Sequence, residues 1–402
     1  MNAADFDLAA TATNQLGIDL HRQLAAGDDN LCLSPYSIQS ALAMTFAGAD
    51  GATRTEMART LHFPNDGDAI HESFASLQQS FDEMAAKSAK IAEQSKKFGG
   101  PSEPIALAIA NRLFPQSGYE FRDPFRELIK KFYGAPFEPL DFRKNAEGAR
   151  QRINKWVADK TRDRIRDLIP PNGVNESTRL ILANAIYLKA PWANDFMDAL
   201  TKSKPFHVRG GGAVDVPTMT NTKKFGYLKE NGFTAVALPY SGNELQFLVL
   251  LPDDVNGLRV LESKLTAETL AKCARLEPRD VDLELPKFRF EPPTTQLADK
   301  FKALGMKSAF DDPPGSANFD RMAPRKPNDY LAISEVFHKT FIAVDEKGTE
   351  AAAATAVAMV ALSARMQKEE PIEVKVDRPF VYAIQHVPSG ACLFIGRVTD
   401  PR

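Results

Sequence analysis

The 402-residue chain has few of the residue patterns that mark catalytic or metal-binding chemistry. It holds six histidines, and no two of them are four residues apart, so no helical zinc pair is predicted. No Gly-x-Ser-x-Gly elbow, glycine-rich phosphate loop or dinucleotide fingerprint occurs. Catalytic triads are scattered in sequence, so these absences weaken the case for an enzyme without removing it. We therefore expect no catalysis, no cofactor and no metal.

Cysteines and long apolar runs are also scarce. Cys32, Cys273 and Cys392 are odd in number and match no zinc spacing, so we expect buried free thiols. No run of eighteen apolar residues exists, which predicts no membrane span. Residues 1–12 lack the apolar segment of a signal peptide. This slightly favours a cytoplasmic protein, although a secreted protein whose signal had been removed would look the same.

No excess of one charge is present. The chain has 50 Lys and Arg against 52 Asp and Glu, a net charge of −2. Charge therefore predicts neither nucleic acid nor an anionic membrane as a partner. The hydrophobic share of 44% is ordinary for a globular protein with a large core.

Helical patterns come first along the chain and strand patterns follow. The spacing of apolar residues predicts helices at 3–26, 37–46, 53–61, from 71 onward, and at 146–169. It predicts strands at 105–114, 180–188, 233–238, 245–251, 281–290 and, in two pieces, 379–398. Neither a βαβ rhythm nor an internal repeat is visible, so we expect an α+β fold in a single domain, 1–402.

One segment fits neither core nor ordinary loop. After the polar stretch 345–350 come fourteen uncharged residues, Ala351 to Ala364, rich in alanine. Three interpretations remain open: a buried helix, which alanine favours, a low-complexity linker, or a strand that is not yet paired in a sheet. Read as a strand, the segment places Thr349 on one face and Glu350 on the other, and Glu350 would face solvent once the strand has inserted into a sheet. Its small side chains would allow it to slip between existing strands without overpacking.

Context separates these interpretations. Upstream lie Val336-Phe337-His338-Lys339 and the stretch from Val344 to Ala352, and downstream lie Asp377-Arg378-Pro379-Phe380 and the stretch from Leu393 to Pro401. Together with Asn30, Ser34-Pro35 and Asn184-Ala185-Ile186-Tyr187 they resemble, in order and at plausible spacing, the motifs of the serpin family. The resemblance covers nearly the whole chain, and the alanine run resembles the hinge of the family's reactive-centre loop.

The resemblance implies a metastable fold with a large mixed sheet and an exposed reactive-centre loop at about 346–371. A serine protease would attack the loop, form an acyl-enzyme and be trapped when the loop inserts into the sheet as a new strand. The implied hinge comprises Glu346, Gly348, Thr349, Glu350, Ala351, Ala352, Ala353, Ala354 and Thr355. Two further sets are implied: a sheet-opening cluster, where strands must part, and an ion pair where the loop enters the sheet. The cluster is Ser34, Ser37, Asn184 and His338, and the pair is Lys287 and Glu346.

The bait bond follows from the family's usual spacing of sixteen residues after the glutamate that corresponds to Glu346. This selects Leu362–Ser363, and leucine suits the apolar primary pocket of a chymotrypsin-like protease. Met359 and Arg365 are alternatives, the second of which would suit trypsin-like enzymes. A serine protease is the expected partner, with a cysteine protease as a second class, and the chain is expected to be a monomer.

Two departures from the family and one alternative function remain. Residues 85–104 resemble an insertion, expected as a solvated helix extension and loop, and the stretch from Leu362 to Phe380 is longer than in many relatives. The lysines between 87 and 97 could bind a polyanion such as heparin, but a merely solvated tail is favoured. The alternative is a non-inhibitory serpin acting as a carrier or chaperone, which bulky or charged core-facing residues at 349–357 would favour. None are present.

Overall fold

A computed structural model of the chain describes all residues except 1–6, 65–66, 98–102, 135–136, 209–210 and 351–369. The helical elements are α1 (Asp7–Leu24), α2 (Pro35–Gly48), α3 (Gly51–Thr60), α4 (Asp68–Lys97), α5 (Asp123–Tyr133), α6 (Phe142–Lys160), η2 (Asp198–Leu200), α7 (Leu258–Lys264), α8 (Ala267–Cys273), α9 (Ala298–Ala303) and η3 (Ser308–Phe310). The strands are β1 (Leu31–Leu33), β2 (Ala106–Pro115), β3 (Leu180–Pro191), β4 (Lys202–Val208), β5 (Gly212–Glu230), β6 (Phe233–Pro239), β7 (Leu245–Pro252), β8 (Pro278–Pro286), β9 (Phe288–Phe290), β10 (Thr295–Gln296), β11 (Glu335–Thr340), β12 (Ile342–Asp345), β13 (Gly348–Thr349), β14 (Ile372–Lys375), β15 (Phe380–His386) and β16 (Cys392–Val398).

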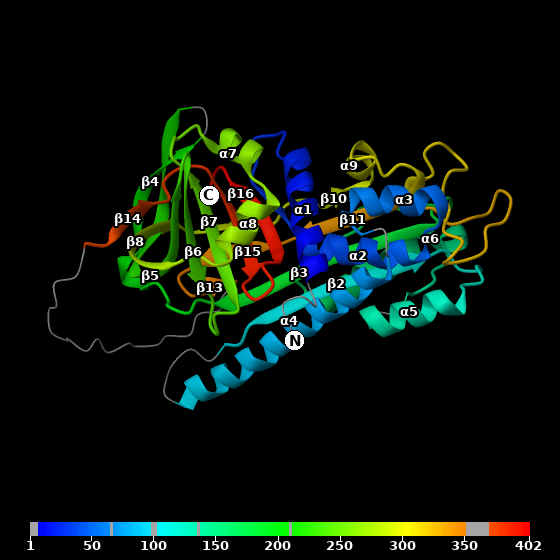
Figure 1. The fold of residues 1–402 in the computed structure, drawn as a ribbon, viewed down its shortest axis with the longest axis horizontal. Helices are drawn as coiled ribbons and strands as arrows, with labels where there is room; N and C mark the ends of the chain where they lie inside the picture. The colour runs from blue at the N-terminus through cyan, green and yellow to red at the C-terminus, as the bar shows by residue number, and fades with distance from the viewer. Residues whose placement is uncertain (1–6, 65–66, 98–102, 135–136, 209–210, 351–369) are drawn as a thin grey trace.

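The strands form two sheets. The central sheet has the order β10-β11-β3-β13-β12-β9, with β2 paired to the other edge of β3. The flanking sheet has the order β1-β16-β15-β7-β6-β5-β8-β14, with β4 paired to β5. Figure 1 shows the flanking sheet on the left, helices α2, α3, α5 and α6 beside the central sheet on the right, and α4 running from the centre toward the lower left. The predicted α+β class is confirmed, because helices cover mixed sheets rather than alternating with parallel strands.

Helix α2 and the central strand β3 are buried along almost their whole length. All fourteen residues of α2 are buried, since this helix packs against β2, β3 and β16 and so lies between the sheets. Ser34 caps it by accepting a hydrogen bond from the Ser37 amide at 3.2 Å, and Pro35 occupies its first turn. Strand β3 is an apolar run buried along almost its whole length, as predicted for a strand covered on both faces.

The predicted helix at 146–169 is wrong over its last nine residues, 161–169. Helix α6 ends at Lys160, and the chain then turns back, with Arg162, Asp163 and Asp167 at positive φ. The Asn154 side chain holds this return by bonding both the amide and the carbonyl of Ile169, at 2.8 and 2.9 Å. The apolar spacing continues past the helix because this irregular segment faces the same small core as α6.

The predicted strand at 281–290 is divided in two. Strand β8 ends at Pro286 in the flanking sheet, and β9 begins at Phe288 in the central sheet. Proline lacks the amide that would continue the ladder. Lys287 therefore lies at the crossover between the two sheets, which places its side chain beside the hinge.

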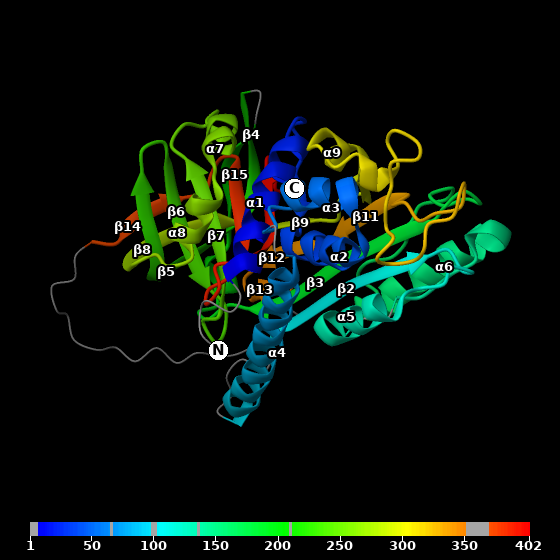
Figure 2. The same cartoon turned by 45° about the vertical axis from the view of Figure 1, so that its right-hand side comes forward.

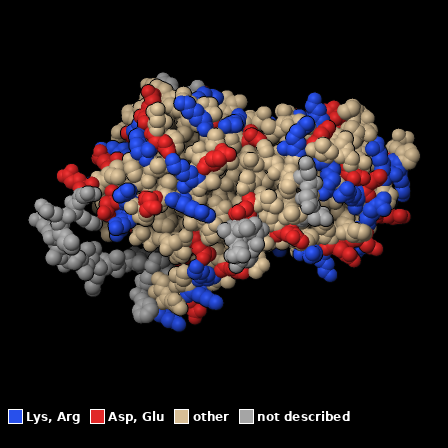
Figure 3. Space-filling view, viewed as in Figure 1, with Lys and Arg blue, Asp and Glu red and all other residues tan. Residues whose placement is uncertain are grey.

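Helix α4 runs on to Lys97, so the predicted helix extension is confirmed as far as that residue. Figure 2 shows α4 as a long rod whose far end projects away from the sheets. Figure 3 shows basic and acidic side chains interspersed over the visible face, without a large field of one sign. Within the described ranges, no helix combines the length and the apolar character that crossing a membrane requires.

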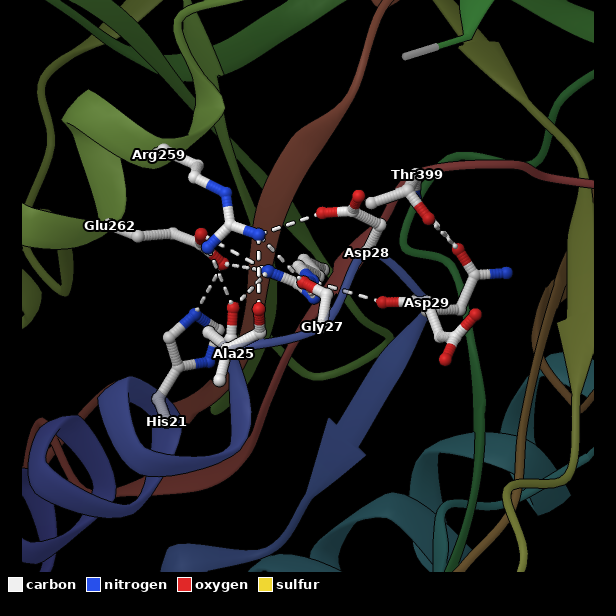
Figure 4. Close-up of polar contacts among 11 residues, drawn as sticks. His21, Ala25, Gly27, Asp28, Asp29, Arg259, Glu262 and Thr399 are labelled. Carbon is white, nitrogen blue, oxygen red and sulfur yellow. Dashed lines mark hydrogen bonds and ion pairs between the residues drawn. The ribbon is translucent and has the colours of Figure 1, made fainter. Parts of the chain in front are cut away.

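One buried arginine near the C-terminus, Arg397, links strand β16 to the N-terminal part of the chain. Arg397 of β16 pairs with Glu262 of α7 at 3.1 Å and donates to the carbonyls of Ala25 and Asp29 at 3.0 Å. His21 of α1 contacts the same Glu262 carboxylate at 3.0 Å (Figure 4). Burial raises the pKa of Glu262, but His21 and Arg397 outweigh it and leave the pKa below its usual value. The cluster has a structural role, since its charges are buried and paired with one another.

Candidate functional site

Two residues of the hinge, Gly348 and Thr349, already form a strand at one end of the central sheet, called its upper end below. Strand β13 lies between β12 and β3, antiparallel to both, with Val344 opposite Thr349 on one side and Ala190 opposite Thr349 on the other. Below it, β11 pairs directly with β3, from Glu335–Ile181 to Thr340–Ile186, and these two strands are parallel. The first residues of the hinge therefore form a short strand at the top of an otherwise closed seam.

Gly348 can hold this position only because it lacks a side chain. Its φ of 151° lies in the region that favours glycine. A Cβ on this residue would lie 2.1 Å from the carbonyl oxygen of Ala190. Asp345 prepares the turn before it, because its carboxylate accepts hydrogen bonds from the amides of Lys347 and Gly348 at 2.8 and 3.2 Å.

Thr349 faces the core. Its side chain is 2% exposed, and its hydroxyl is hydrogen-bonded to the hydroxyl of Tyr240. Tyr240 in turn stacks on Trp192 of the loop that follows β3, with ring centroids 4.7 Å apart. Burial raises the pKa of Tyr240 above its usual value, so the phenol stays neutral. Sequence reasoning placed Thr349 on this face but did not find Tyr240, which lies 109 residues away.

Glu350 is mostly buried in the hinge as it stands before insertion. Its side chain is 10% exposed and forms an ion pair with Arg164 from the turn after α6. Its amide donates to the carbonyl of Ala343 at 2.8 Å, and its φ of 46° turns the chain out of the sheet. Burial raises the pKa of Glu350, while Arg164 and a hydrogen bond to Tyr187 act in the opposite direction. The exposure of Glu350 after insertion stays a prediction, because the strand described here ends at Thr349.

The pair expected where the loop enters the sheet is brought together. The Lys287 ammonium lies 2.7 Å from Glu346, whose carboxylate also accepts a hydrogen bond from the Thr201 hydroxyl at 2.7 Å. Burial raises the pKa of Glu346, but the bonds from Lys287 and Thr201 outweigh it, so the pKa is lower than usual. The glutamate is thus a charged anchor at the base of the hinge.

The structure also brings together the four residues of the sheet-opening cluster. The Ser34 amide donates to Nε2 of His338 at 3.0 Å, so the other ring nitrogen, Nδ1, carries the proton and donates to Asn184. The Asn184 amide group donates to the Ser37 hydroxyl at 2.8 Å. Burial lowers the pKa of His338 to about 3, so the ring is neutral near pH 7. These contacts link α2 to β3 and β11, the two strands that loop insertion would separate.

Sequence reasoning missed a fifth member of this cluster. The Asn111 side chain of β2 accepts hydrogen bonds from Ser37 at 2.8 Å and from Asn184 at 2.7 Å, and donates to the Ser37 carbonyl at 2.9 Å. A signal existed, because Asn111 is a lone amide within the apolar run 105–114. A polar side chain there needs partners if it is buried.

The rest of the predicted loop lies outside the described residues. This holds for the hinge residues Ala351, Ala352, Ala353, Ala354 and Thr355, for the bait bond Leu362–Ser363, and for the alternatives Met359 and Arg365. The chain is described again from Glu370, and β14 then pairs in parallel with β8. The three cysteines are buried and unpaired, as predicted. Among the described residues no group of three or more His, Cys, Asp or Glu could hold a metal ion.

Comparisons with known proteins agree with this geometry. A family model described as "Serpin (serine protease inhibitor)" matches residues 11–401. An uncharacterized serpin-like protein of Thermococcus kodakarensis is 37% identical over 394 residues, covering 97% of this chain and 85% of that protein. The leukocyte elastase inhibitor of Bos taurus is 36% identical over 403 residues, covering 98% and 99%. The solved structure of human thyroxine-binding globulin is similar with a TM-score of 0.81 at 26% identity, covering 99% of each chain.

Proposed function

The chain belongs to the serpin family, and from this we propose that it inhibits serine proteases as a suicide substrate rather than acting as an enzyme. The protease attacks the Leu362–Ser363 bond and forms an acyl-enzyme with Leu362. The freed segment then inserts between β3 and β11 and carries the protease with it. Distortion of the tethered active site blocks deacylation, since a displacement of about 1 Å can cost on the order of 100-fold in rate.

One observation carries this proposal. Gly348 and Thr349 already form a short strand between β3 and β12, antiparallel to both, which is the geometry that a longer inserted strand would continue. About fourteen further residues would span roughly 45 Å at about 3.3 Å per residue. Each ladder hydrogen bond gained would contribute about 0.5–1.5 kcal/mol net. Insertion is therefore favourable once cleavage frees one end of the loop.

An apolar target pocket is supported by two independent points. Leu362 stands sixteen residues after Glu346, the anchored glutamate at the base of the hinge. Relatives at 34–36% identity are named leukocyte elastase inhibitors. We assign a chymotrypsin-like protease as the target class, with cysteine proteases as a second class, and a monomer as the acting form.

The direct test is to mix the chain with chymotrypsin and look for a covalent complex that survives denaturing electrophoresis. Mass spectrometry of the released C-terminal fragment should give Ser363 as its first residue. The matched variant Leu362→Arg should lose the complex with chymotrypsin and gain one with trypsin. A fragment that begins at Met366 would instead move the bait to Arg365 and change the target class.

A carrier or chaperone function is the second candidate, because the name of one similar solved protein states that it binds thyroxine. Loop cleavage separates the two candidates. An inhibitor that inserts its loop gains a central strand, so nicking between residues 358 and 365 should raise the melting temperature far above that of the intact chain. Equal or lower melting after the nick would favour the carrier.

A further inference from the structure

A cavity of about 970 Å³ lies between helix α5 and the two segments that flank this helix. Its lining comes from residues 119–121 before α5, from α5 itself, and from Gly134, Phe137 and Pro139 after it. Within the described part of the chain, neither β2 nor α4 contributes a lining residue. Figure 1 shows α5 at the lower right of the molecule. The volume is in the range of small-molecule sites in proteins.

Three aromatic side chains line the cavity. Tyr119, Phe121 and Phe137 are each half-buried. The ring centroids of Phe121 and Phe137 are 4.6 Å apart, so the segments before and after α5 meet here, and Phe125 of α5 lies 5.8 Å from Phe137. The Tyr119 hydroxyl donates a hydrogen bond to the Asp329 carboxylate at 2.6 Å. The rings are therefore held in place before a ligand arrives, which lowers the entropic cost of binding.

The charged lining residues of α5 share one face of the helix. Arg126, Glu127 and Lys130 stand three, four and seven residues after Asp123, which is helical spacing. Glu120, from the segment before the helix, adds a further carboxylate to the lining. Three carboxylates and two cations line the cavity, so its net charge is −1.

Two of the carboxylates are available to a ligand. Asp123 is paired with Arg126 at 3.5 Å. Glu120 and Glu127 are exposed, and neither forms an ion pair with another described residue. Lys130 also lacks a carboxylate partner there, so it offsets one of these two charges. A ligand with a single positive charge would make the lining neutral.

The aromatic rings decide which kind of cation fits. The negative face of an aromatic ring attracts an organic ammonium group within about 6 Å of its centroid. A divalent metal ion instead needs several oxygen ligands brought together. Among the described residues, no group of three or more His, Cys, Asp or Glu could hold such an ion. The lining therefore favours an organic cation over a metal.

We propose that this cavity binds an organic ammonium ion with an aromatic body. The body packs against Phe121 and Phe137, and the ammonium group lies over an aromatic face, where Glu120 and Glu127 provide the compensating charge. Binding does not depend on protease inhibition, so either can fail while the other stands.

Binding is tested by calorimetry on the intact chain at pH 7 with tryptamine, whose amine is protonated. Tryptophol carries a hydroxyl in place of the ammonium group and is the uncharged control, and indoleacetate is the anionic control. Tryptamine should give saturable binding of one molecule per chain. Tryptophol should bind at least tenfold more weakly, and indoleacetate more weakly still. No saturable binding of tryptamine, or equal binding of tryptophol, would overturn the proposal.

Charge variants locate the site. Glu120→Gln with Glu127→Gln should weaken tryptamine binding at least tenfold. Glu93→Gln with Glu277→Gln, which removes two exposed carboxylates outside the cavity, should leave binding unchanged. Lys130→Gln should strengthen binding about threefold, because it removes a repulsive charge. This gain is informative, since damage to the fold would weaken binding instead.

A ring variant tests the aromatic contribution. Phe121→Leu removes one ring but keeps an apolar side chain of similar size. Tryptamine should bind about threefold more weakly, and tryptophol should be affected less because it has no charge to lose contact with the ring. Unchanged tryptamine affinity in the double glutamate variant, or weaker binding by Lys130→Gln, would place the ligand elsewhere and overturn the assignment.

Discussion

Strand β3 pairs with β11 over Ile181–Ile186, the middle of the seam, and with β13 of the hinge at Ala190–Pro191, its upper end. Different interactions hold these two regions. In the middle, neutral groups join α2 to the strands, four of them buried (Ser34, Ser37, Asn184 and a neutral His338) and one, Asn111, half-buried. At the upper end, partly exposed ion pairs hold the hinge, with Lys287 at Glu346 and Arg164 at Glu350. Buried hydrogen bonds are insensitive to salt, whereas exposed charges are screened over about 10 Å. The hinge should therefore respond to ionic strength and the middle to packing and acid.

The largest expected effect comes from placing a charge in the upper end of the seam. Thr349→Arg should convert the inhibitor into a substrate, because a guanidinium in this buried position, 2% exposed, lacks a partner and costs several kcal/mol. The hinge then leaves the sheet and loop insertion slows. Hydrolysis of the acyl-enzyme therefore becomes faster than insertion. The covalent complex should fall at least tenfold while cleavage at Leu362–Ser363 continues. Electrophoresis with mass spectrometry measures both.

The control for this substitution cannot be Glu350→Arg. Glu350 is itself buried against Arg164, so arginine there would place two guanidinium groups together. Glu370→Arg is the better match, since Glu370 is exposed at the far end of the loop. It should keep full complex yield. An undiminished complex from Thr349→Arg would show that insertion at this residue is not part of the mechanism.

A smaller effect follows from removing one amide in the middle of the seam. Asn184→Ala leaves the Nδ1–H donor of His338 without an acceptor, and it leaves Asn111 and Ser37 each without one partner. Each buried group left unsatisfied costs about 1–3 kcal/mol, so unfolding free energy should drop by about 2–4 kcal/mol. Urea unfolding followed by tryptophan fluorescence measures this. Gln94→Ala on the exposed side of α4 is the control and should change stability by less than about 0.5 kcal/mol.

The same region predicts a dependence on pH. Burial lowers the pKa of His338 to about 3, against about 6.5 in the unfolded chain, so its stabilising contribution is complete above pH 6.5. It is lost as pH falls from 6.5 toward 3, because the unfolded state then binds a proton that the folded state does not. By pH 5 the loss should be on the order of 2 kcal/mol.

A variant isolates this contribution. Burial also lowers the pKa of His386, to about 4, so acid weakens the fold at two sites. His338→Gln should therefore be less stable at pH 7 but lose about 2 kcal/mol less than the parent between pH 7 and pH 5. Urea midpoints at both pH values decide the matter. Parallel curves for the two proteins would mean that His338 does not titrate as assigned.

A smaller effect still is expected from the ion pair at the upper end. Arg164→Ala should loosen the hinge, so the Glu350 amide, bonded to the Ala343 carbonyl, should exchange its hydrogen about fivefold faster in 20 mM salt. In 1 M salt the parent chain should approach the variant, because Arg164 is half exposed and its charge is screened. Arg166→Ala, which removes an exposed pair with Asp163, should leave the exchange rate unchanged.

The contrast between the two regions also explains what the sequence could predict. Motif spacing located Glu346, Lys287 and the four residues of the sheet-opening cluster, and apolar runs located β3, β7 and β16, because these depend on local composition and a family pattern. Tyr240 and Arg164 were not found, since their contacts to Thr349 and Glu350 join segments more than 100 residues apart.

Two errors in the predicted elements have the same origin. The apolar positions after Lys160 fit a helical stripe, yet Asn154 folds the chain back so that Ile169 reaches the core without a helix. The alternation across Lys287 fits one strand, yet Pro286 ends the ladder and the chain passes to the other sheet. In each case a side chain or ring changes the backbone path while the apolar pattern continues.

The smallest expected effect concerns the far end of α4. Lys90, Lys96 and Lys97 are exposed, but Glu93 lies among them and Lys87 is paired with Glu244, which dilutes the positive field. Heparin at low salt should therefore change the rate of protease inhibition by less than about twofold. A rate increase of more than tenfold that disappears in a Lys90→Gln, Lys96→Gln, Lys97→Gln variant would contradict this. The Gly242 turn, which adjoins Ile91 of α4 and leads back to Tyr240, would then be the route by which α4 reaches Thr349.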